Sequence, residues 1–180
     1  MPKNIVTLYI DDTSLRLMVS EGRTIREWLE SPLEPGLVQK NVVMNEAEVT
    51  ARLQQLFKRQ KLATGKITVG VSGLQCLSRP IFFPQLPREM LDEAVKREAK
   101  RVLPVPPEQL HISWQTIPAP EGKAGVFLVA IPRRTVDSLL KALHGAGLKP
   151  YFLDVKPMPL TRVVSEATAV IVDVQTAEFD

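Results

Sequence analysis

The 180-residue sequence contains a single cysteine, Cys76, and so offers no pair for an internal disulfide bond. We expect its thiol to be a structural group in the protein interior. The two histidines, His111 and His144, have no cysteine or histidine close to them in the sequence. A structural zinc site is therefore not expected. The sequence also lacks a phosphate-binding P-loop and a nucleophile elbow, which excludes two common classes of enzyme.

Long apolar runs are missing as well. No apolar stretch approaches the roughly 20 residues that a helix needs to cross a bilayer. Residues 1–4 lead directly into strand-like sequence, without the basic and apolar regions that make up a signal peptide. We therefore expect a cytoplasmic protein that reaches the inner face of a membrane only through a partner.

The positive charge of the chain is modest, with a formal net charge of +3. Lysine and arginine form two local clusters, at residues 58–61 and 96–101. Both clusters fall on predicted helices, where a solvated polar face is the usual explanation. No aromatic-rich RNA motif, zinc spacing or heptad repeat accompanies them. The sequence therefore predicts no binding to nucleic acid.

What the sequence does contain is an alternation of strand and helix patterns. In its first part, strands are expected at residues 5–10, 15–19, 24–29 and 66–71. A helix is expected before the last of these, because Asn45 is a good N-cap and Glu48 follows it at the spacing of a capping box. Apolar residues then recur on one face of residues 49–57. This part reads as a sheet with one helix packed across it.

The second part begins near Ser72 and again contains both strand and helix patterns. Its expected elements are a strand at 77–83, a helix at 91–103, strands at 111–117 and 125–131, a helix at 136–143, a strand at 148–155, a helix at 159–167 and a strand at 169–174. Prolines lie mostly at the edges of these elements, as expected where they end or begin a helix. The pattern predicts an α+β protein of two lobes.

Two groups of residues carry a family resemblance. The order of strand, acidic turn, strand, strand, helix and strand, with Ile10-Asp11-Asp12-Thr13-Ser14 at the turn, resembles the opening of an actin-like ATPase fold. The segments 80–106, 129–137 and 146–157 resemble the PilM family of type IV pilus assembly proteins, which is related to the cell-division protein FtsA. The chain resembles only the N-terminal half of that family.

The resemblance implies a particular arrangement of the two lobes. Residues 1–73, completed by 158–180, would form an incomplete actin-like (ribonuclease H-like) first subdomain. Residues 74–157 would form an inserted strand–helix–strand–strand module of the PilM/FtsA type. The strand expected at 169–174 is similar to the one that leads into the second phosphate loop of the family.

The same resemblance implies a nucleotide site, made of Asp11, Asp12, Thr13, Ser14 and Asp173. Two positions depart from the family pattern, because Asp12 and Gln175 stand where glycine is expected. The second carboxylate would repel a phosphate by about 4 kcal/mol at a separation of ~4 Å and an effective dielectric of 20. An acidic turn that hydrogen-bonds its own backbone is the simpler interpretation. We expect a degenerate site, no catalysis and no cofactor, with ATP and Mg²⁺ possible only in a full-length family member.

A binding role is the better-supported expectation. The resemblance implies that a groove beside the inserted module holds the N-terminal peptide of an inner-membrane assembly protein similar to PilN. The candidate contact residues are Phe82, Phe83, Arg101, Val102 and Leu103. Plain core packing is the competing interpretation of the apolar members, and a solvated helix end that of Arg101. An FtsA-like ATP-binding protein of cell division and a self-associating component of a type II secretion platform remain the alternative functions.

Overall fold

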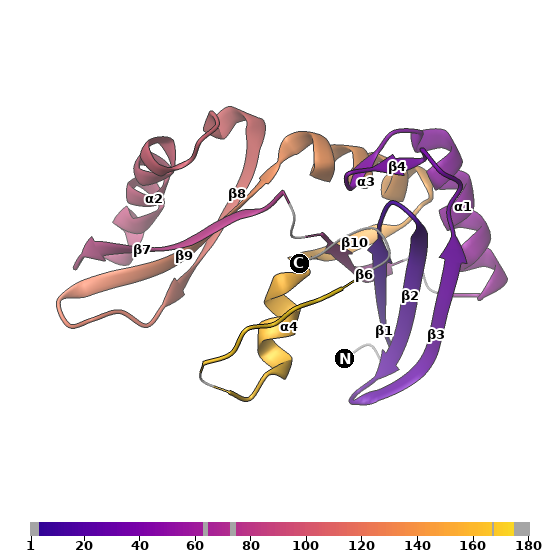
Figure 1. Ribbon diagram of the computed structural model, residues 1–180, viewed down its shortest axis with the longest axis horizontal. Coiled ribbons are helices and arrows are strands. Elements are labelled where there is room, and N and C mark those ends of the chain that lie inside the picture. The colour runs from indigo at the N-terminus through magenta and orange to yellow at the C-terminus, as the bar shows by residue number, and fades with distance from the viewer. Residues whose placement is uncertain (1–3, 63–64, 73–74, 167, 175–180) are drawn as a thin grey trace. The chain divides into compact units, whose positions relative to one another are not determined.

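The computed structural model describes residues 4–62, 65–72, 75–166 and 168–174 (Figure 1). The chain is a mixed α+β protein, as predicted, and divides into two units. The first unit consists of residues 1–74 together with 137–180, and the second of residues 75–136. No helix among the described residues is both long enough and apolar enough to cross a membrane.

A five-stranded sheet in the order β10-β6-β1-β2-β3 forms the centre of the first unit. Its strands are β1 (Ile5–Ile10), β2 (Ser14–Glu21), β3 (Thr24–Pro32), β6 (Gly65–Val71) and β10 (Lys149–Val155). The first three strands form an antiparallel meander, as predicted, whereas β6 and β10 are parallel to their neighbours. A short hairpin of β4 (Val38–Gln39) and β5 (Val42–Val43) precedes the first helix.

One face of this sheet provides the core of the first unit. Leu8 lies opposite Leu17 on one side and Val69 on the other, and all three side chains are fully buried. Each such side chain contributes about 1.5–3 kcal/mol when it leaves water. Two helices of this unit also bury apolar faces: α1 (Glu46–Arg59), and α3 (Arg133–Gly145) from residue 137 onward.

Polar contacts hold these two helices together. The hydroxyl of Thr50 donates to the carbonyl oxygen of Ala142 at 3.2 Å, and the Gln54 amide donates to that of Gly145 at 3.1 Å. The predicted N-cap of α1 is confirmed, because Asn45 Oδ1 accepts a hydrogen bond from the backbone amide of Glu48 at 3.1 Å. The cap satisfies one of the four amides that a helix N-terminus leaves without an intrahelical partner.

The second unit is a strand–helix–strand–strand module, as predicted. Its elements are β7 (Leu77–Pro84), α2 (Arg88–Val102), a 3₁₀ turn η1 (Pro107–Gln109), β8 (Leu110–Ile117) and β9 (Lys123–Pro132). The strands form an antiparallel sheet in the order β7-β9-β8. One face of this sheet packs against α2 through the buried cluster Ile81, Leu91, Val95, Ala99, Val126 and Leu128.

The boundary of the module differs from the expected one. The sequence placed residues 137–157 with the module, whereas the structure places them in the first unit. The reason is strand pairing, since β10 lies beside β6, with Leu153 opposite Val69. The module therefore ends at residue 136 instead of residue 157. Local periodicity identifies β10 as a strand but does not say which sheet it joins.

The end of the described chain also differs from the prediction. The helix expected at 159–167 is α4 (Pro157–Val163), and the strand expected at 169–174 is absent from the described residues there. Residues 168–173 form no ladder, and Val170 and Val172 are 91% and 71% exposed. A strand pattern needs a neighbouring strand and a covered face to become a strand, and within the described residues this segment has only an isolated bridge at Val174 and half-buried side chains at Ile171 and Asp173.

Candidate functional site

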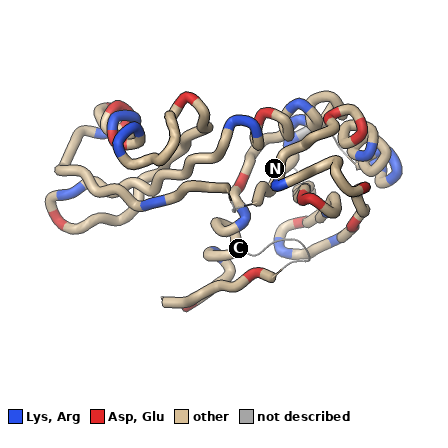
Figure 2. The backbone as a smooth tube through the Cα atoms, turned by 45° about the horizontal axis from the view of Figure 1, so that its top comes forward, with Lys and Arg blue, Asp and Glu red and all other residues tan. Residues whose placement is uncertain are grey.

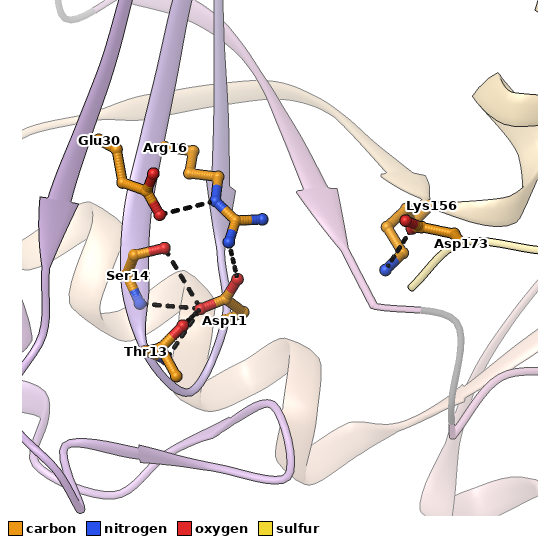
Figure 3. Close-up of polar contacts among 7 residues, drawn as sticks. All are labelled: Asp11, Thr13, Ser14, Arg16, Glu30, Lys156 and Asp173. Carbon is orange, nitrogen blue, oxygen red and sulfur yellow. Dashed lines mark hydrogen bonds and ion pairs between the residues drawn. The ribbon is translucent and has the colours of Figure 1, made fainter. Parts of the chain in front are cut away.

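The acidic turn between β1 and β2 is organised by the carboxylate of Asp11, which is buried (Figure 3). Asp11 Oδ1 accepts hydrogen bonds from the backbone amides of Thr13 and Ser14, each at 2.8 Å. It also accepts one from the Thr13 hydroxyl at 2.8 Å. Successive backbone amides of this kind form a natural binding site for an anion. In this protein the anion is the side chain of the turn's own aspartate.

The second oxygen of Asp11 contacts a cation on the neighbouring strand. The guanidinium of Arg16 lies 3.2 Å from Asp11 Oδ2 and donates through Nε to Glu30 at 3.1 Å (Figure 3). The hydrogen bond from Arg16 lowers the pKa of Glu30 below its ordinary range. Arg16 therefore joins β3 to the acidic turn and balances the charge of Asp11.

Asp12 faces a different partner. Its two carboxylate oxygens accept hydrogen bonds from the backbone amides of Lys40, at 2.7 Å, and Asn41, at 2.9 Å. Lys40 and Asn41 form the two-residue turn between β4 and β5, and both have positive φ, at 49° and 61°. Positive φ is unfavourable for a residue such as Lys40, so a fixed carboxylate that bonds both amides stabilises the turn. This contact is a structural reason for an aspartate where the actin-like pattern has glycine.

Asp173, the fifth residue of the predicted nucleotide site, pairs with a lysine. Its carboxylate lies 2.9 Å from Lys156 Nζ, and Figure 3 shows the two as a pair apart from the acidic turn. Lys156 Nζ also lies over the ring of Tyr9, 5.7 Å from its centre. The structure thus joins Asp11, Thr13 and Ser14 to one another, whereas Asp12 and Asp173 bond elsewhere. Among the described residues, no cluster of side chains has the composition of a metal site.

The five candidate partner-binding residues do not share one surface. Phe82 and Phe83 are neighbours in β7, so their side chains point to opposite faces of the sheet. Phe83 packs against the cluster under α2, whereas Phe82 is 46% exposed on the opposite face, called here the outer face. On this face Phe82 lies beside Gly125, whose other neighbour is Ile117.

The other three candidates lie at the end of α2. Val102 and Leu103 pack against the same cluster as Phe83. They also line a small pocket of about 170 Å³, with Leu77, Ser78, Arg79 and Pro104. Arg101 points to solvent and donates through Nε to Glu98 at 3.0 Å. Core packing therefore accounts for Phe83, Val102 and Leu103, and a solvated ion pair for Arg101.

Sequence reasoning missed Arg16, Glu30 and Lys156 as partners of the acidic residues, because each is recruited through sheet pairing or tertiary packing. One local signal was available. Lys40-Asn41 stands between Val38-Gln39 and Val42-Val43, and asparagine in a two-residue loop favours a hairpin turn with positive φ.

A comparison with models of protein families identifies the family of the chain. A family model described as type IV pilus assembly protein PilM matches residues 15–178, almost the whole chain. The chain belongs to this family. The comparison with curated proteins gave no match.

Solved structures agree with the family. A structure titled "PilM-PilN type IV pilus biogenesis complex" matches 85% of this chain with a TM-score of 0.75 and 29% sequence identity. The cytoplasmic domain of EpsL, an inner-membrane component of the type II secretion system of Vibrio cholerae, matches 83% of this chain with a TM-score of 0.56 and 11% sequence identity. The ethanolamine utilization protein EutJ from Carboxydothermus hydrogenoformans matches 97% of this chain with a TM-score of 0.53 and 10% sequence identity.

The last two structures show only that the fold is shared. The predicted actin-like fold is confirmed by these matches together with the PilM structure. The chain spans 47%, 56% and 44% of the three matched chains, or about half of each.

Proposed function

We propose that this PilM-family chain is a binding component of a type IV pilus machine and holds the N-terminal segment of a PilN-like, membrane-anchored protein. The observation that carries the proposal is the match to the PilM-PilN complex over 85% of the chain at 29% identity. The partner would keep the chain at the cytoplasmic face of the membrane. Self-association is the competing use of exposed apolar surface, and a dilution experiment distinguishes it from peptide binding.

The outer face of the module is the surface that fits an extended peptide best. Within the module, α2 covers the other side of the sheet, and the outer face carries the exposed Phe82 with the half-buried Phe127 and Ile117. Gly125 lies between Phe82 and Ile117 in the sheet. Exposed aromatic side chains are typical anchors at the centre of a binding surface.

The test is a titration of a fluorescent peptide with the N-terminal sequence of a PilN protein, followed by anisotropy. Phe82→Ala is expected to weaken binding about tenfold or more, the usual effect of losing an aromatic anchor. Trp28→Ala is the matched control, because Trp28 is 59% exposed in the first unit and lies outside the module. Equal affinities for wild type and Phe82→Ala would contradict the proposed surface.

Mass action distinguishes the two uses of the surface. Capture of a peptide should persist when the protein is diluted to a monomer, whereas contacts between copies should be lost. Light scattering on the same samples measures the mass. Peptide binding that disappears on dilution together with a fall in mass would favour self-association.

We propose in addition that the acidic turn is structural and that the chain catalyses no nucleotide reaction. The amides of Thr13 and Ser14 already donate to Asp11, so a phosphate would have to displace a buried, ion-paired carboxylate. Calorimetric titration with MgATP is expected to give no micromolar binding in a preparation that binds the peptide. A clear one-to-one isotherm would contradict this part of the proposal.

A further inference from the structure

A second surface of the module lies on the other side of its sheet. A groove of about 620 Å³ runs between α2 and the edge strand β8. Its floor is apolar and includes Val95, Ile112 and Trp114, and its rim includes Arg97, Lys100 and Arg133. All the residues that line the groove belong to the second unit.

The two edges of the module's sheet are built differently. β7 carries Pro80, Pro84 and the charged Arg79, which are the usual devices against pairing with another strand. β8, Leu110–Ile117, has eight residues and contains neither proline nor a charged side chain. An edge of this length without such protection is a ready template for an added strand. The groove lies along this unprotected edge.

The charges on the rim favour an acidic occupant. In the groove, Lys96 is already paired with Asp92, at 2.7 Å, and with Glu93, at 3.0 Å. Figure 2 shows acidic and basic positions close together along α2. Arg97 and Lys100, one and four residues after Lys96, are exposed and form no ion pair with a described residue.

The 3₁₀ turn and the first residue of α3 add one charge of each sign to the groove, Glu108 and Arg133. Arg133 donates through Nε to the backbone oxygen of Glu108 at 2.8 Å. Apart from the Lys96, Asp92 and Glu93 group, the groove is therefore lined by three cations (Arg97, Lys100 and Arg133) and one carboxylate, that of Glu108. A peptide that brings carboxylates to these cations would find an electrostatic match.

We propose that the α2–β8 groove binds an extended acidic peptide, which adds as a fourth strand to the edge of β8. The peptide's backbone would pair with β8. Side chains on one of its faces would lie over Trp114 and Ile112, and a carboxylate would meet Arg97 and Lys100. The site lies on the α2 side of the sheet, whereas Phe82 lies on the outer face, so the two surfaces take different segments.

Trp114 provides a direct signal for binding. It lines the groove, and the only other tryptophan is Trp28. In a Trp28→Phe protein, a change of emission on titration therefore reports on Trp114 alone. The probe is the blocked hexapeptide Val-Thr-Glu-Thr-Glu-Thr, whose valine and glutamates share one face of an extended strand and which is long enough to cover roughly 20 Å of β8. A saturable shift that weakens with added salt is expected.

Charge reversals in α2 test the rim. The double variant Arg97→Glu, Lys100→Glu is expected to weaken binding about tenfold or more. Arg88→Glu makes the same kind of reversal on the same helix outside the groove and should leave affinity unchanged. Circular dichroism checks that all variants remain folded. Unchanged affinity in the double variant would overturn the proposal, and so would equal affinity for a peptide with lysine in place of glutamate.

Backbone methylation tests strand addition itself. Two versions of the peptide carry N-methyl groups on the odd or on the even residues, so each version blocks one edge of the strand. Because only one edge can face β8, one version should bind and the other should not. Equal binding by both would overturn strand addition. Tighter binding of a ten-residue oligothymidylate at the same site would replace the peptide with a nucleic acid and overturn the proposed occupant.

The result is independent of the proposed pilus function. Phe82→Ala should leave the acidic hexapeptide unaffected, and the Arg97, Lys100 double variant should leave the PilN peptide unaffected. Loss of both interactions in one variant would show that the two surfaces are not separate and would overturn this inference.

Discussion

The carboxylate of Asp12 accepts a hydrogen bond from the backbone amide of Lys40 at 2.7 Å, across 28 residues of sequence. A second bond, from Asn41, completes a clamp on a turn in which both residues have positive φ. The acidic turn and the β4–β5 hairpin are therefore joined by these two hydrogen bonds. In the sequence, Asp12 is a departure from the glycine expected at a phosphate contact. In the structure, its carboxylate stabilises the turn between β4 and β5.

Replacement of Asp12 should therefore cost stability. Asp12→Ala removes both acceptors and is expected to lower the free energy of unfolding by about 1–3 kcal/mol. Asp12→Gly, which restores the family residue, should be at least as destabilising because it loses the same bonds. Asp12→Asn keeps one acceptor and serves as the intermediate control. Urea denaturation gives the three values, and an Asp12→Gly protein as stable as wild type would contradict the clamp.

Much of the fold could be predicted because its signals are local. Asn45 and Glu48 mark the start of α1 in the sequence, and the structure shows the expected bond between them. The strand–helix–strand–strand module follows from periodicity and from the prolines at its edges. The partner of β10 could not be predicted, since its pairing with β6 joins segments about 80 residues apart.

The candidate sites were harder to predict for the same reason. Periodicity reads Phe82 and Phe83 as one apolar pair, but a strand separates them onto two faces. Which face of the sheet α2 covers depends on tertiary packing, which the local sequence does not show. Likewise, the sequence shows the charges of Asp11 and Asp12 but not the arginine or the turn amides that occupy them.

Asp92 offers a test by pH. Hydrogen bonds from Lys96 and then from Trp114 Nε1, at 3.2 Å, lower the pKa of Asp92 below its ordinary value of 3.8. A carboxyl group with a lowered pKa contributes its bonds fully above the ordinary value and loses them as the pH falls through the lowered one. In a Trp28→Phe protein, the emission of Trp114 should therefore change with a midpoint below pH 3.8.

The matched control for this titration is Asp92→Asn, which has no carboxyl group to protonate and should lack the transition. Circular dichroism at each pH separates local protonation from unfolding. A midpoint at or above the ordinary value would show that the hydrogen bonds do not hold Asp92 ionised.

Gly125 is expected to tolerate no side chain. A Cβ at this position would lie 2.9 Å from the carbonyl oxygen of Ile117 and 3.1 Å from Ala119 Cβ. Gly125→Ala should cost about 1–3 kcal/mol, because the backbone contact cannot be relieved by a rotamer change. Adding Ala119→Gly removes only the second contact and should rescue part of the loss. Thermal or urea unfolding measures both, and a loss below about 0.5 kcal/mol for Gly125→Ala would contradict the close approach.

The neighbours Phe82 and Phe83 should separate binding from stability. Phe83 packs against the buried cluster under α2, so Phe83→Ala is expected to cost about 2–3 kcal/mol, less than a fully buried phenylalanine would. Phe82 is 46% exposed, and Phe82→Ala should cost less than about 1 kcal/mol. The reverse order is expected for the PilN peptide: Phe82→Ala weakens its binding, whereas Phe83→Leu, which keeps the core filled, does not. Urea denaturation and peptide anisotropy on the same four proteins, wild type included, give the comparison. If Phe83→Leu weakened the peptide as much as Phe82→Ala, the peptide would not be held on the outer face alone.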